Sequence, residues 1–271
     1  MDGKTLKETL KTGGRVYGFM ISAMASARFG RALKGSTADY VVIDGEHGSR
    51  DRSEIESLCT MLHHAGIAPV VRVPAPKAEW VAMALDAGAS GVLVPYCETV
   101  DEVRAVVATA NWHPLKGTYL RRAIEEGIFP SAEAKAYLEA RHQHSFVIIG
   151  IESEPAFENL EAILDVGHID GIFIGPNDLT TSLGIPDDYA NPKYLDVVKT
   201  IIEKSEERGV PVMVHQQSVE TSAKAIDLGA RFILHAMDTN LLQRAIEGEL
   251  GALRKVAGDV SKESKDTVDI A

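Results

Sequence analysis

Short apolar runs rich in Val and Ile recur along the chain, and amphipathic stretches of helix length separate them. This alternation is typical of buried parallel strands joined by crossover helices. Eight strands in one chain of this length favour a closed barrel over an open doubly wound sheet, so the predicted fold is α/β, a (β/α)8 barrel of TIM type. The eight strands are expected at residues 15–20, 40–44, 69–73, 91–95, 146–152, 171–175, 211–215 and 232–236.

Helix signals lie between these runs. The pattern predicts helices over 76–87, 100–109 and 218–228, and glycines follow the first and the third of them, at Gly88 and Gly229. The segment 96–145 is longer than one helix requires and is predicted to hold a second helix, from Ser131 as N-cap to about residue 141. Because this insertion leaves the C-terminal end of the fourth strand, we expect it over the active face. One barrel domain is predicted over 1–257, with a polar tail over 258–271.

Polar residues at the C-terminal ends of the predicted strands are the candidates for chemistry, because a parallel barrel carries its reactive groups there. The four histidines elsewhere are set aside on that rule. They are His113, His142, His144 and His168. The rule selects Asp44, Glu46, His47, Arg72, Glu152, Asp178, His215 and His235.

Glu152 and Asp178 close consecutive strands, so their carboxylates are expected close together. Two carboxylates without a histidine or cysteine in the same motifs favour Mg²⁺ or Mn²⁺, with water and substrate oxygens completing the coordination. The alternative is that each acid only caps the helix that follows it. For either acid alone, helix capping and metal binding carry equal weight. For the two acids together, capping is the weaker explanation.

Arg72 ends an apolar strand, where a guanidinium requires an anion or several hydrogen bonds. One interpretation is that this anion is a carboxylate or enolate of a bound ligand. The other is that it is Asp44 on the neighbouring strand. The two interpretations do not exclude each other. His47 follows Glu46 and is a candidate for proton transfer. The alternative is a solvated loop histidine. For His215 and His235 the choice between substrate or metal contact and a structural hydrogen bond stays open.

Composition narrows the class of protein. A net charge of −11 and a pI near 5.3 argue against nucleic-acid and membrane partners. The chain has two cysteines, a charged start and no apolar run long enough to cross a bilayer. These features predict a cytoplasmic protein. The turns after the last two predicted strands lack the glycines of a phosphate site, which disfavours a phosphosugar substrate.

At this point the chain resembles the HpcH/HpaI family of metal-dependent pyruvate aldolases over nearly its whole length, from residue 18 to about residue 242. The resemblance depends on several motifs in combination. They are IDGEH at 43–47, VVRVP at 70–74, LDAG at 85–88, VLVP at 92–95, IES at 151–153, GIFIGPNDLT at 171–180 and DTNLL at 238–242.

The resemblance implies a barrel of the phosphoenolpyruvate/pyruvate domain type and a role for each site residue. Glu152 and Asp178 would hold a divalent metal, Mg²⁺ or Mn²⁺ with Co²⁺ as a further candidate, to which a 2-oxo acid binds. The metal and Arg72 would stabilise the enolate formed when the carbon–carbon bond breaks, with Asp44 in support. His47 would serve the proton transfers.

The resemblance also gives Asp86 the role of raising the basicity of that histidine. Asp86 ends a predicted helix and so belongs to the floor of its own barrel, where it can meet only the His47 of another subunit. This implies a homo-oligomer, a hexamer or trimer of dimers with exchanged C-terminal helices.

Three departures from the family pattern concern the substrate. Gly150 stands where the family commonly has a substrate-contacting Gln, Asn177 stands where it commonly has Ala, and the segment 116–123 is shorter than the usual loop. Gly150 and Asn177 are therefore candidate substrate-binding positions. The metal and enolate residues are retained.

The predicted activity is reversible, metal-dependent cleavage of a 4-hydroxy-2-oxo acid to pyruvate and an aldehyde. The rival within enzymes is another metal–enolate lyase or a decarboxylase acting on a 2-oxo diacid. The rival from another class is a non-catalytic barrel that binds a metal and a carboxylate ligand.

Overall fold

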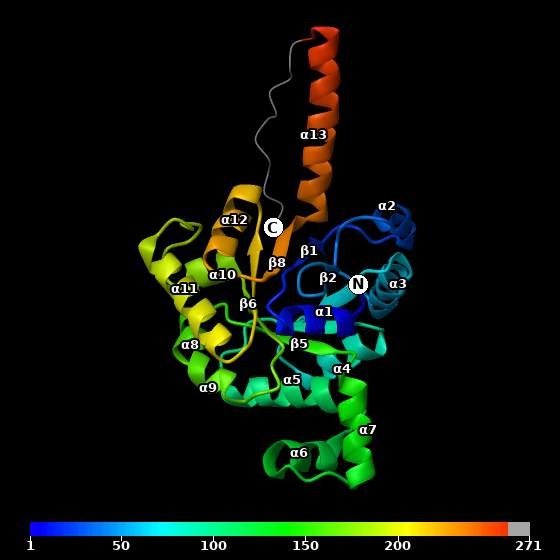
Figure 1. The fold of residues 1–271 in the computed structure, drawn as a ribbon, viewed down its shortest axis with the longest axis vertical. Helices are drawn as coiled ribbons and strands as arrows, with labels where there is room; N and C mark the ends of the chain where they lie inside the picture. The colour runs from blue at the N-terminus through cyan, green and yellow to red at the C-terminus, as the bar shows by residue number, and fades with distance from the viewer. Residues whose placement is uncertain (260–271) are drawn as a thin grey trace.

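Eight parallel strands close into a single barrel in the computed structural model, which describes residues 1–259 (Figure 1). Each strand is hydrogen-bonded to its neighbours in sequence, and the last one pairs with the first. All eight predicted runs coincide with strands to within two residues at each end, so the predicted (β/α)8 fold is confirmed. The strands are β1 Val16–Ile21, β2 Tyr40–Asp44, β3 Ala68–Arg72, β4 Gly91–Val94, β5 Phe146–Gly150, β6 Gly171–Ile174, β7 Val212–Gln216 and β8 Phe232–Met237.

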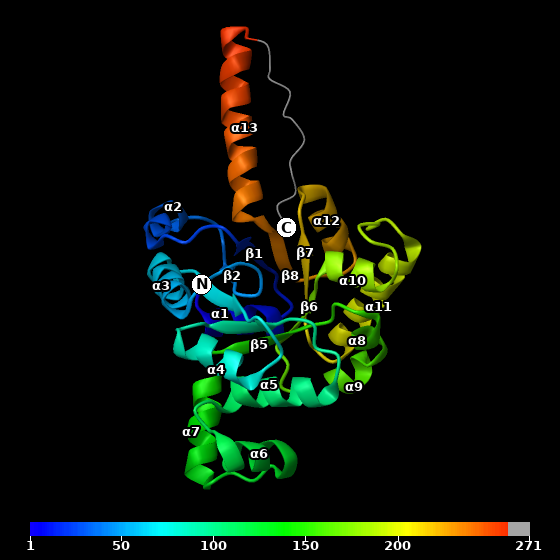
Figure 2. The ribbon, with the colours of Figure 1, turned by 180° about the vertical axis from the view of Figure 1, so that it is seen from behind.

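Helices surround this barrel and connect its strands (Figures 1 and 2). The N-cap predicted at Ser131 is present, since its hydroxyl accepts a hydrogen bond from the Ala134 amide. Gly88 has a φ of 93° in the turn that follows α4, as its position after a helix predicts. The helices are α1 Gly3–Lys11, η1 Ala27–Phe29, α2 Gly30–Leu33, α3 Arg52–Ala65, α4 Ala78–Asp86, α5 Val100–Trp112, α6 Gly117–Glu126, α7 Ala132–His142, α8 Glu154–Glu158, α9 Leu160–Leu164, α10 Pro176–Ser182, α11 Pro192–Glu207, α12 Val219–Asp227 and α13 Asp238–Ala257.

The alternation of side chains along each strand decides which residues face the barrel interior. Tyr40 and Val42 of β2 belong to the cluster that fills the interior, and Asp44 continues the same face. On β3, Val70 is followed on that face by Arg72, which lies in register with Asp44. The strand period therefore carries charged side chains into the top of the barrel.

Helix α1 closes the opposite, N-terminal end of the barrel. Leu6 and Leu10 of α1 pack into the interior cluster with Phe146 and Phe232. Burial of a leucine side chain is worth roughly 1.5–3 kcal/mol relative to leaving it exposed, so these contacts hold the helix in place. The C-terminal ends of the strands are left as the face on which a site can form.

The insertion at 96–145 divides between the two ends of the barrel. Its first residues border the C-terminal face, where the Tyr96 hydroxyl donates to the Pro74 carbonyl. The end of α7 lies at the N-terminal end instead, where His142 contacts Lys7 of α1. Helices α6 and α7 project beyond α5, away from α13 (Figure 2). The expected position over the active face therefore holds for the start of the insertion and is wrong for α6 and α7 in the single chain.

Helix α13 projects from the barrel as a long arm (Figure 1). It starts at Asp238, whose carboxylate accepts hydrogen bonds from the backbone amides of Ser22 and Met24 and so joins the helix to the end of β1. The predicted polar tail lies, from residue 260 on, outside the described residues. No helix within residues 1–259 is both long enough and apolar enough to cross a membrane.

Candidate active site

Asp44 and Arg72 form a buried ion pair at the C-terminal ends of β2 and β3. The guanidinium Nε lies 2.9 Å from Asp44 Oδ1 and Nη2 lies 2.8 Å from Oδ2, a two-point contact that fixes its plane. Burial acts to raise the pKa of Asp44, but hydrogen bonds and charge from Arg72 outweigh it and place the pKa below its ordinary value. The ion pair between Arg72 and Asp44, one of the two interpretations of Arg72, is therefore present. It is compatible with the other interpretation, in which Arg72 binds a carboxylate or enolate of the substrate.

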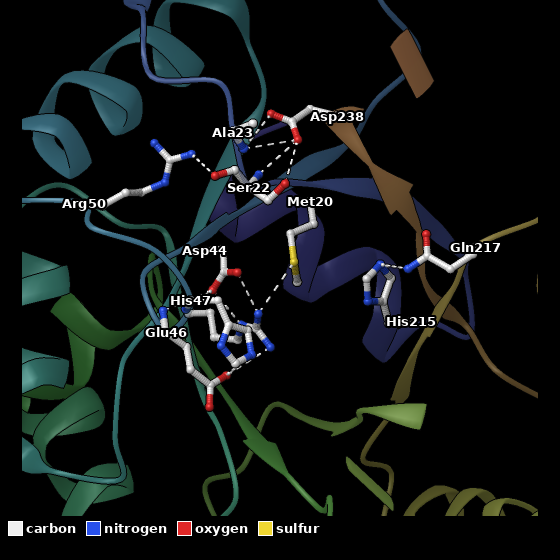
Figure 3. Close-up of polar contacts among 11 residues, drawn as sticks. Met20, Ser22, Ala23, Asp44, Glu46, His47, Arg50, His215, Gln217 and Asp238 are labelled. Atoms are coloured by element: carbon white, nitrogen blue, oxygen red, sulfur yellow. Dashed lines mark hydrogen bonds and ion pairs between the residues drawn. The ribbon is translucent and has the colours of Figure 1, made fainter. Parts of the chain in front are cut away.

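Glu46, which the strand-end rule selected as the neighbour of His47, is a third member of this cluster. Its Oε2 lies 3.0 Å from Nη1 of Arg72 and 3.8 Å from Nε2 of His47 (Figure 3). Burial raises the pKa of Glu46, and the charge of Arg72 opposes this rise. The signal available in the sequence was its place between Asp44 and His47 in a short loop. The Asp44 carboxylate organises that loop, since Oδ1 accepts hydrogen bonds from the amides of Glu46 and His47.

His47 is the solvent-facing member of the cluster, with 65% of its side chain exposed. It stands beside the Glu46 and Arg72 pair rather than inside the barrel. An imidazole in this position has access both to the site and to water, which suits a group that exchanges protons.

Glu152 and Asp178 converge on one point above β5 and β6. A Cβ atom at Gly175 would collide with Glu152 Oε1 and would lie 3.2 Å from Asp178 Oδ2. A methyl group at position 175 would therefore displace the Glu152 carboxylate from its place beside Asp178. The N-cap of α8 is Ser153 and the N-cap of α10 is Gly175. Neither Glu152 nor Asp178 therefore occupies the N-cap position of the helix that it was expected to cap under the alternative interpretation.

The electrostatics of this pair fit a cation. Glu152 is only 4% exposed, and burial raises its pKa to about 8, although the Tyr96 amide donates to its Oε2 at 2.6 Å. A divalent ion would compensate the buried charge and restore the ionised form. Among residues 1–259 no group of three or more His, Cys, Asp or Glu side chains is placed to bind a metal. Two carboxylates with water and substrate oxygens are thus the ligand set that this site offers to Mg²⁺ or Mn²⁺.

Gly150 is confined by the backbone that crosses it. A Cβ at this position would lie 2.7 Å from Glu152 Oε2 and 3.0 Å from the Tyr96 nitrogen. Tyr96 has a φ of 36°, which is unusual for a residue with a side chain, and its amide is thereby aimed at Glu152. The space that a larger residue would need at Gly150 is therefore taken by the Tyr96 backbone. Any substrate contact at Gly150 must come from main-chain atoms.

Asn177 lies beside Asp178 in the first turn of α10 and is exposed. Its carboxamide contacts the hydroxyl of Tyr189 at 2.7 Å. Tyr189, in the loop before α11, is a residue that the strand-end rule could not find because it is twelve positions away along the chain.

His215 and His235 are held by structural hydrogen bonds. Nε2 of His215 lies 3.3 Å from Gln217 Nε2 (Figure 3), and the ring also bonds the Ala236 backbone. Burial lowers the pKa of His215 to about 4, so the ring is neutral near pH 7. Nδ1 of His235 lies 2.8 Å from the Ser222 hydroxyl. These contacts agree with the structural interpretation of both histidines, and the charges of Arg72 and Asp44 also act on His215.

Asp86 ends α4 at the N-terminal end of the barrel. Its Oδ1 lies 2.7 Å from Nε2 of His113, which the strand-end rule had set aside. Its carboxylate is 64% exposed. Because His47 lies at the other end of the barrel, Asp86 and His47 of one chain do not meet.

The fold and the site together define an enzyme of the (β/α)8 class with a carboxylate-rich centre at the C-terminal face. Residues 19–245 match the family model described as HpcH/HpaI aldolase/citrate lyase. The chain therefore belongs to the HpcH/HpaI family and is an enzyme of the lyase kind, as the sequence motifs predicted.

Similar proteins support this assignment. A 4-hydroxy-2-oxovalerate aldolase of Rhodococcus jostii (strain RHA1) is 31% identical, with 93% of this chain and 97% of the relative aligned. A 2-keto-3-deoxy-L-rhamnonate aldolase of Salmonella gallinarum (strain 287/91 / NCTC 13346) is 28% identical over 92% and 93% of the two chains. The crystal structure of an HpcH/HpaI aldolase from Desulfitobacterium hafniense DCB-2 superposes with a TM-score of 0.79, at 25% identity over 94% and 99%.

Proposed function

We propose that this protein is a divalent-metal-dependent aldolase that cleaves a 4-hydroxy-2-oxo acid reversibly to pyruvate and an aldehyde. The observation that carries the proposal is the convergence of Glu152 and Asp178 at Gly175, beside the cluster that holds Arg72. The charges of Arg72, Glu46 and Asp178 all act on Glu152, so these groups belong to one site. Names of the relatives support aldol chemistry on 2-oxo acids.

Each residue has a physical task in this proposal. A divalent ion held by Glu152 and Asp178 would supply Lewis-acid stabilisation of negative charge on the 2-oxo acid. Arg72 binds the same oxygen-rich substrate and stabilises charge that develops as the carbon–carbon bond breaks. Asp44 and Glu46 keep the guanidinium in one orientation, so that no reorganisation is needed during the reaction. His47 removes the proton from the 4-hydroxyl group and later protonates the enolate carbon through water.

We also propose that the enzyme acts as a homo-oligomer, a hexamer or trimer of dimers. Helix α13 exposes Leu242, Ile246, Leu250 and Leu253, whose spacing places them on one face of the helix. An apolar face of this kind on a projecting helix favours a partner. The exposed carboxylate of Asp86 is then available to the His47 of a neighbouring subunit. A cytoplasmic location is part of the same proposal and is supported by two free buried thiols, Cys59 and Cys97.

The proposal is tested by exchange of the pyruvate methyl protons with deuterated water, followed by NMR. We expect exchange that a chelator removes and that Mg²⁺ or Mn²⁺ restores. The substitution Glu152→Gln should abolish it, while Glu154→Gln, in the same segment but on the surface, should keep it. A wild-type protein without metal-dependent exchange would refute the proposal.

Product analysis separates the aldolase from the rival lyases. Release of pyruvate together with an aldehyde supports the aldolase, whereas pyruvate with carbon dioxide alone supports a decarboxylase. The non-catalytic barrel is excluded by any metal-dependent turnover.

A further inference from the structure

Strand β1 lies between β8 and β2 in the barrel, so the residues that follow it have a neighbour on each side. In register, Met20 of β1 lies beside Met237 of β8, and Ile21 lies beside Ile43 of β2. The segment 22–24 therefore leaves the barrel between the start of α13 and the loop that follows β2 (Figure 3). Contacts made by this segment can join these two neighbours.

Asp238, the first residue of α13, binds the segment 22–24 from the β8 side. Its Oδ1 accepts hydrogen bonds from the Ser22 amide at 3.1 Å and from the Ser22 hydroxyl at 2.9 Å. Its Oδ2 accepts from the amides of Ala23 at 3.2 Å and Met24 at 2.6 Å. Asp238 is only 8% exposed, and a buried carboxylate requires several such donors. The segment is therefore fixed relative to α13.

Arg50 binds the same segment from the β2 side. Its Nη2 donates to the Ser22 carbonyl oxygen at 2.9 Å (Figure 3). Its Nε is buried and has no hydrogen-bond partner in the part of the chain that the structure describes. The Ser22 carbonyl is thus the protein group that orients this guanidinium, and Asp238 holds the same residue from the other side.

The loop between β2 and α3 carries His47 between two anchors. At its start, Asp44 Oδ1 accepts a hydrogen bond from the His47 amide at 3.3 Å. At its end, Arg50 is bound to the segment 22–24. Gly48, with a φ of 99°, lies between them, and the His47 side chain is 65% exposed. Because glycine leaves the backbone free and side-chain packing on His47 is slight, the position of the imidazole depends on both anchors.

We infer that Arg50 and Asp238 are positioning residues for His47. They join α13 to the loop that carries His47 through the segment 22–24, and so place the imidazole for proton transfer. Neither residue contacts the substrate in this role. The inference rests on the proposed aldolase function, in which His47 transfers protons, and adds that the first residue of α13 belongs to the frame of the active site.

Two substitutions of Arg50 test the link from the β2 side. Arg50→Met keeps an unbranched side chain and removes the donor, whereas Arg50→Lys keeps a donor. We expect kcat for exchange of the pyruvate methyl protons to fall about ten-fold in Arg50→Met, the effect of losing one charged hydrogen bond, and to recover largely in Arg50→Lys. Arg52→Met, in the exposed first turn of α3, is the matched control and should keep the wild-type kcat.

The separation of kcat from binding distinguishes positioning from general damage. Glu152 and Asp178 follow β5 and β6, which do not contribute to the link. The KM for pyruvate and the affinity for Mn²⁺, measured by isothermal titration calorimetry, should therefore stay at their wild-type values in Arg50→Met. A wild-type kcat in this variant, or a loss of Mn²⁺ affinity equal to the loss of kcat, overturns the inference.

Substitutions on the other side test the link from α13. Asp238→Asn replaces one accepting oxygen with an amino group, so it loses the bonds of that oxygen. Ser22→Ala removes only the hydroxyl donor and leaves α13 unchanged, which keeps the test valid if Asp238→Asn does not fold. Both should lower kcat without changing Mn²⁺ affinity, Ser22→Ala by about two- to three-fold. Asp196→Asn, exposed on α11, is the control.

A double variant tests whether the two sides act through the same segment. The losses of kcat in Ser22→Ala and Arg50→Met should be less than multiplicative when combined, because both act on the position of one loop. Losses that multiply show that the two residues act independently and contradict the link.

The imidazole NMR signal of His47 reports the link without turnover. It is assigned by its absence from the spectrum of His47→Asn. Arg50→Met should shift this signal, and Arg50→Lys should return it toward its wild-type position. A signal that stays in place in Arg50→Met overturns the inference.

Failure of the inference and failure of the proposed function give different results. If wild-type protein exchanges the pyruvate methyl protons and Arg50→Met does so with the same kcat, only the inference fails. If the wild type shows no exchange with any divalent ion, the proposed function fails, and the His47 signal still shows whether Arg50 positions this residue.

Discussion

Arg72 illustrates how single residues set the chemistry of this site. It is 6% exposed and touches two carboxylates, Asp44 and Glu46, through different nitrogens of one planar group. A planar guanidinium can make all these contacts at once, while an ammonium group acts as a point charge.

The substitution Arg72→Lys should therefore keep the charge and lose the geometry. We expect the rate of pyruvate proton exchange to fall about 10²- to 10³-fold, comparable with the loss of one preorganised donor. Arg104→Lys, on the exposed part of α5, is the control and should retain the wild-type rate. A rate within a factor of two of wild type in Arg72→Lys would show that orientation of the guanidinium is unimportant.

Gly175 leaves room for the carboxylates of Glu152 and Asp178, which we propose bind the metal, to lie close together. The substitution Gly175→Ala places a methyl group against Glu152 Oε1 and should lower Mn²⁺ affinity by about 10- to 100-fold, the range seen when the surroundings of metal ligands are altered. Isothermal titration calorimetry measures this directly. Gly248→Ala meets no atom within 4 Å and should bind Mn²⁺ like the wild type. Equal affinities for all three proteins would place the metal elsewhere.

At the scale of elements, α1 and α7 meet in a polar contact beneath the barrel. The ammonium group of Lys7 lies 3.0 Å from Asp170 and 3.2 Å from Nε2 of His142. Burial lowers the pKa of His142 to about 3, and the positive charge of Lys7 acts in the same direction. The folded protein therefore keeps this imidazole neutral under conditions in which the unfolded chain protonates it.

This difference predicts a loss of stability in acid. Between pH 6.5 and about 3 the unfolded state binds one proton more at His142, so the free energy of unfolding falls as pH falls, by up to about 1.4 kcal/mol per pH unit from this group. Burial raises the pKa of Asp170, which makes the free energy of unfolding rise as pH falls. This contribution is present in both the wild type and His142→Gln, so it does not affect the difference between them. Urea unfolding of His142→Gln should give a shallower pH dependence than wild type. The exposed neighbour provides the control, since His144→Gln should keep the wild-type slope.

At the scale of the whole molecule, α13 is the element whose apolar face stays exposed in a single chain. It extends away from the barrel (Figure 2), and the side chain of Leu250, near its middle, is 48% exposed. The Asp86 carboxylate, at the other end of the barrel from His47, is the second feature that a single chain does not use within the proposed site. Association of subunits would account for both.

The substitution Leu250→Glu should weaken this association, because it places a charge on the apolar face of α13. Light scattering coupled to size exclusion should give a mass near the 29.3 kDa of one chain, and turnover should fall with it. Lys255→Gln changes the net charge by the same amount on another face of the helix and should leave the oligomer intact. A wild-type protein that is fully active as a monomer would contradict the proposed assembly.

The sequence by itself determined the barrel, because the strand period and the length of the intervening helices are local properties of the chain. It also determined the strand-end positions of Asp44, Arg72, Glu152 and Asp178, since parallel strands bring their C-terminal ends to one face. Tertiary structure alone decided which side chains touch. The link from Asn177 to Tyr189 joins two separate elements, and the space at Gly150 is filled by backbone from another strand end. The position of α6 and α7 depended likewise on packing at the barrel floor. Such contacts depend on how elements distant in sequence pack, which no local pattern encodes.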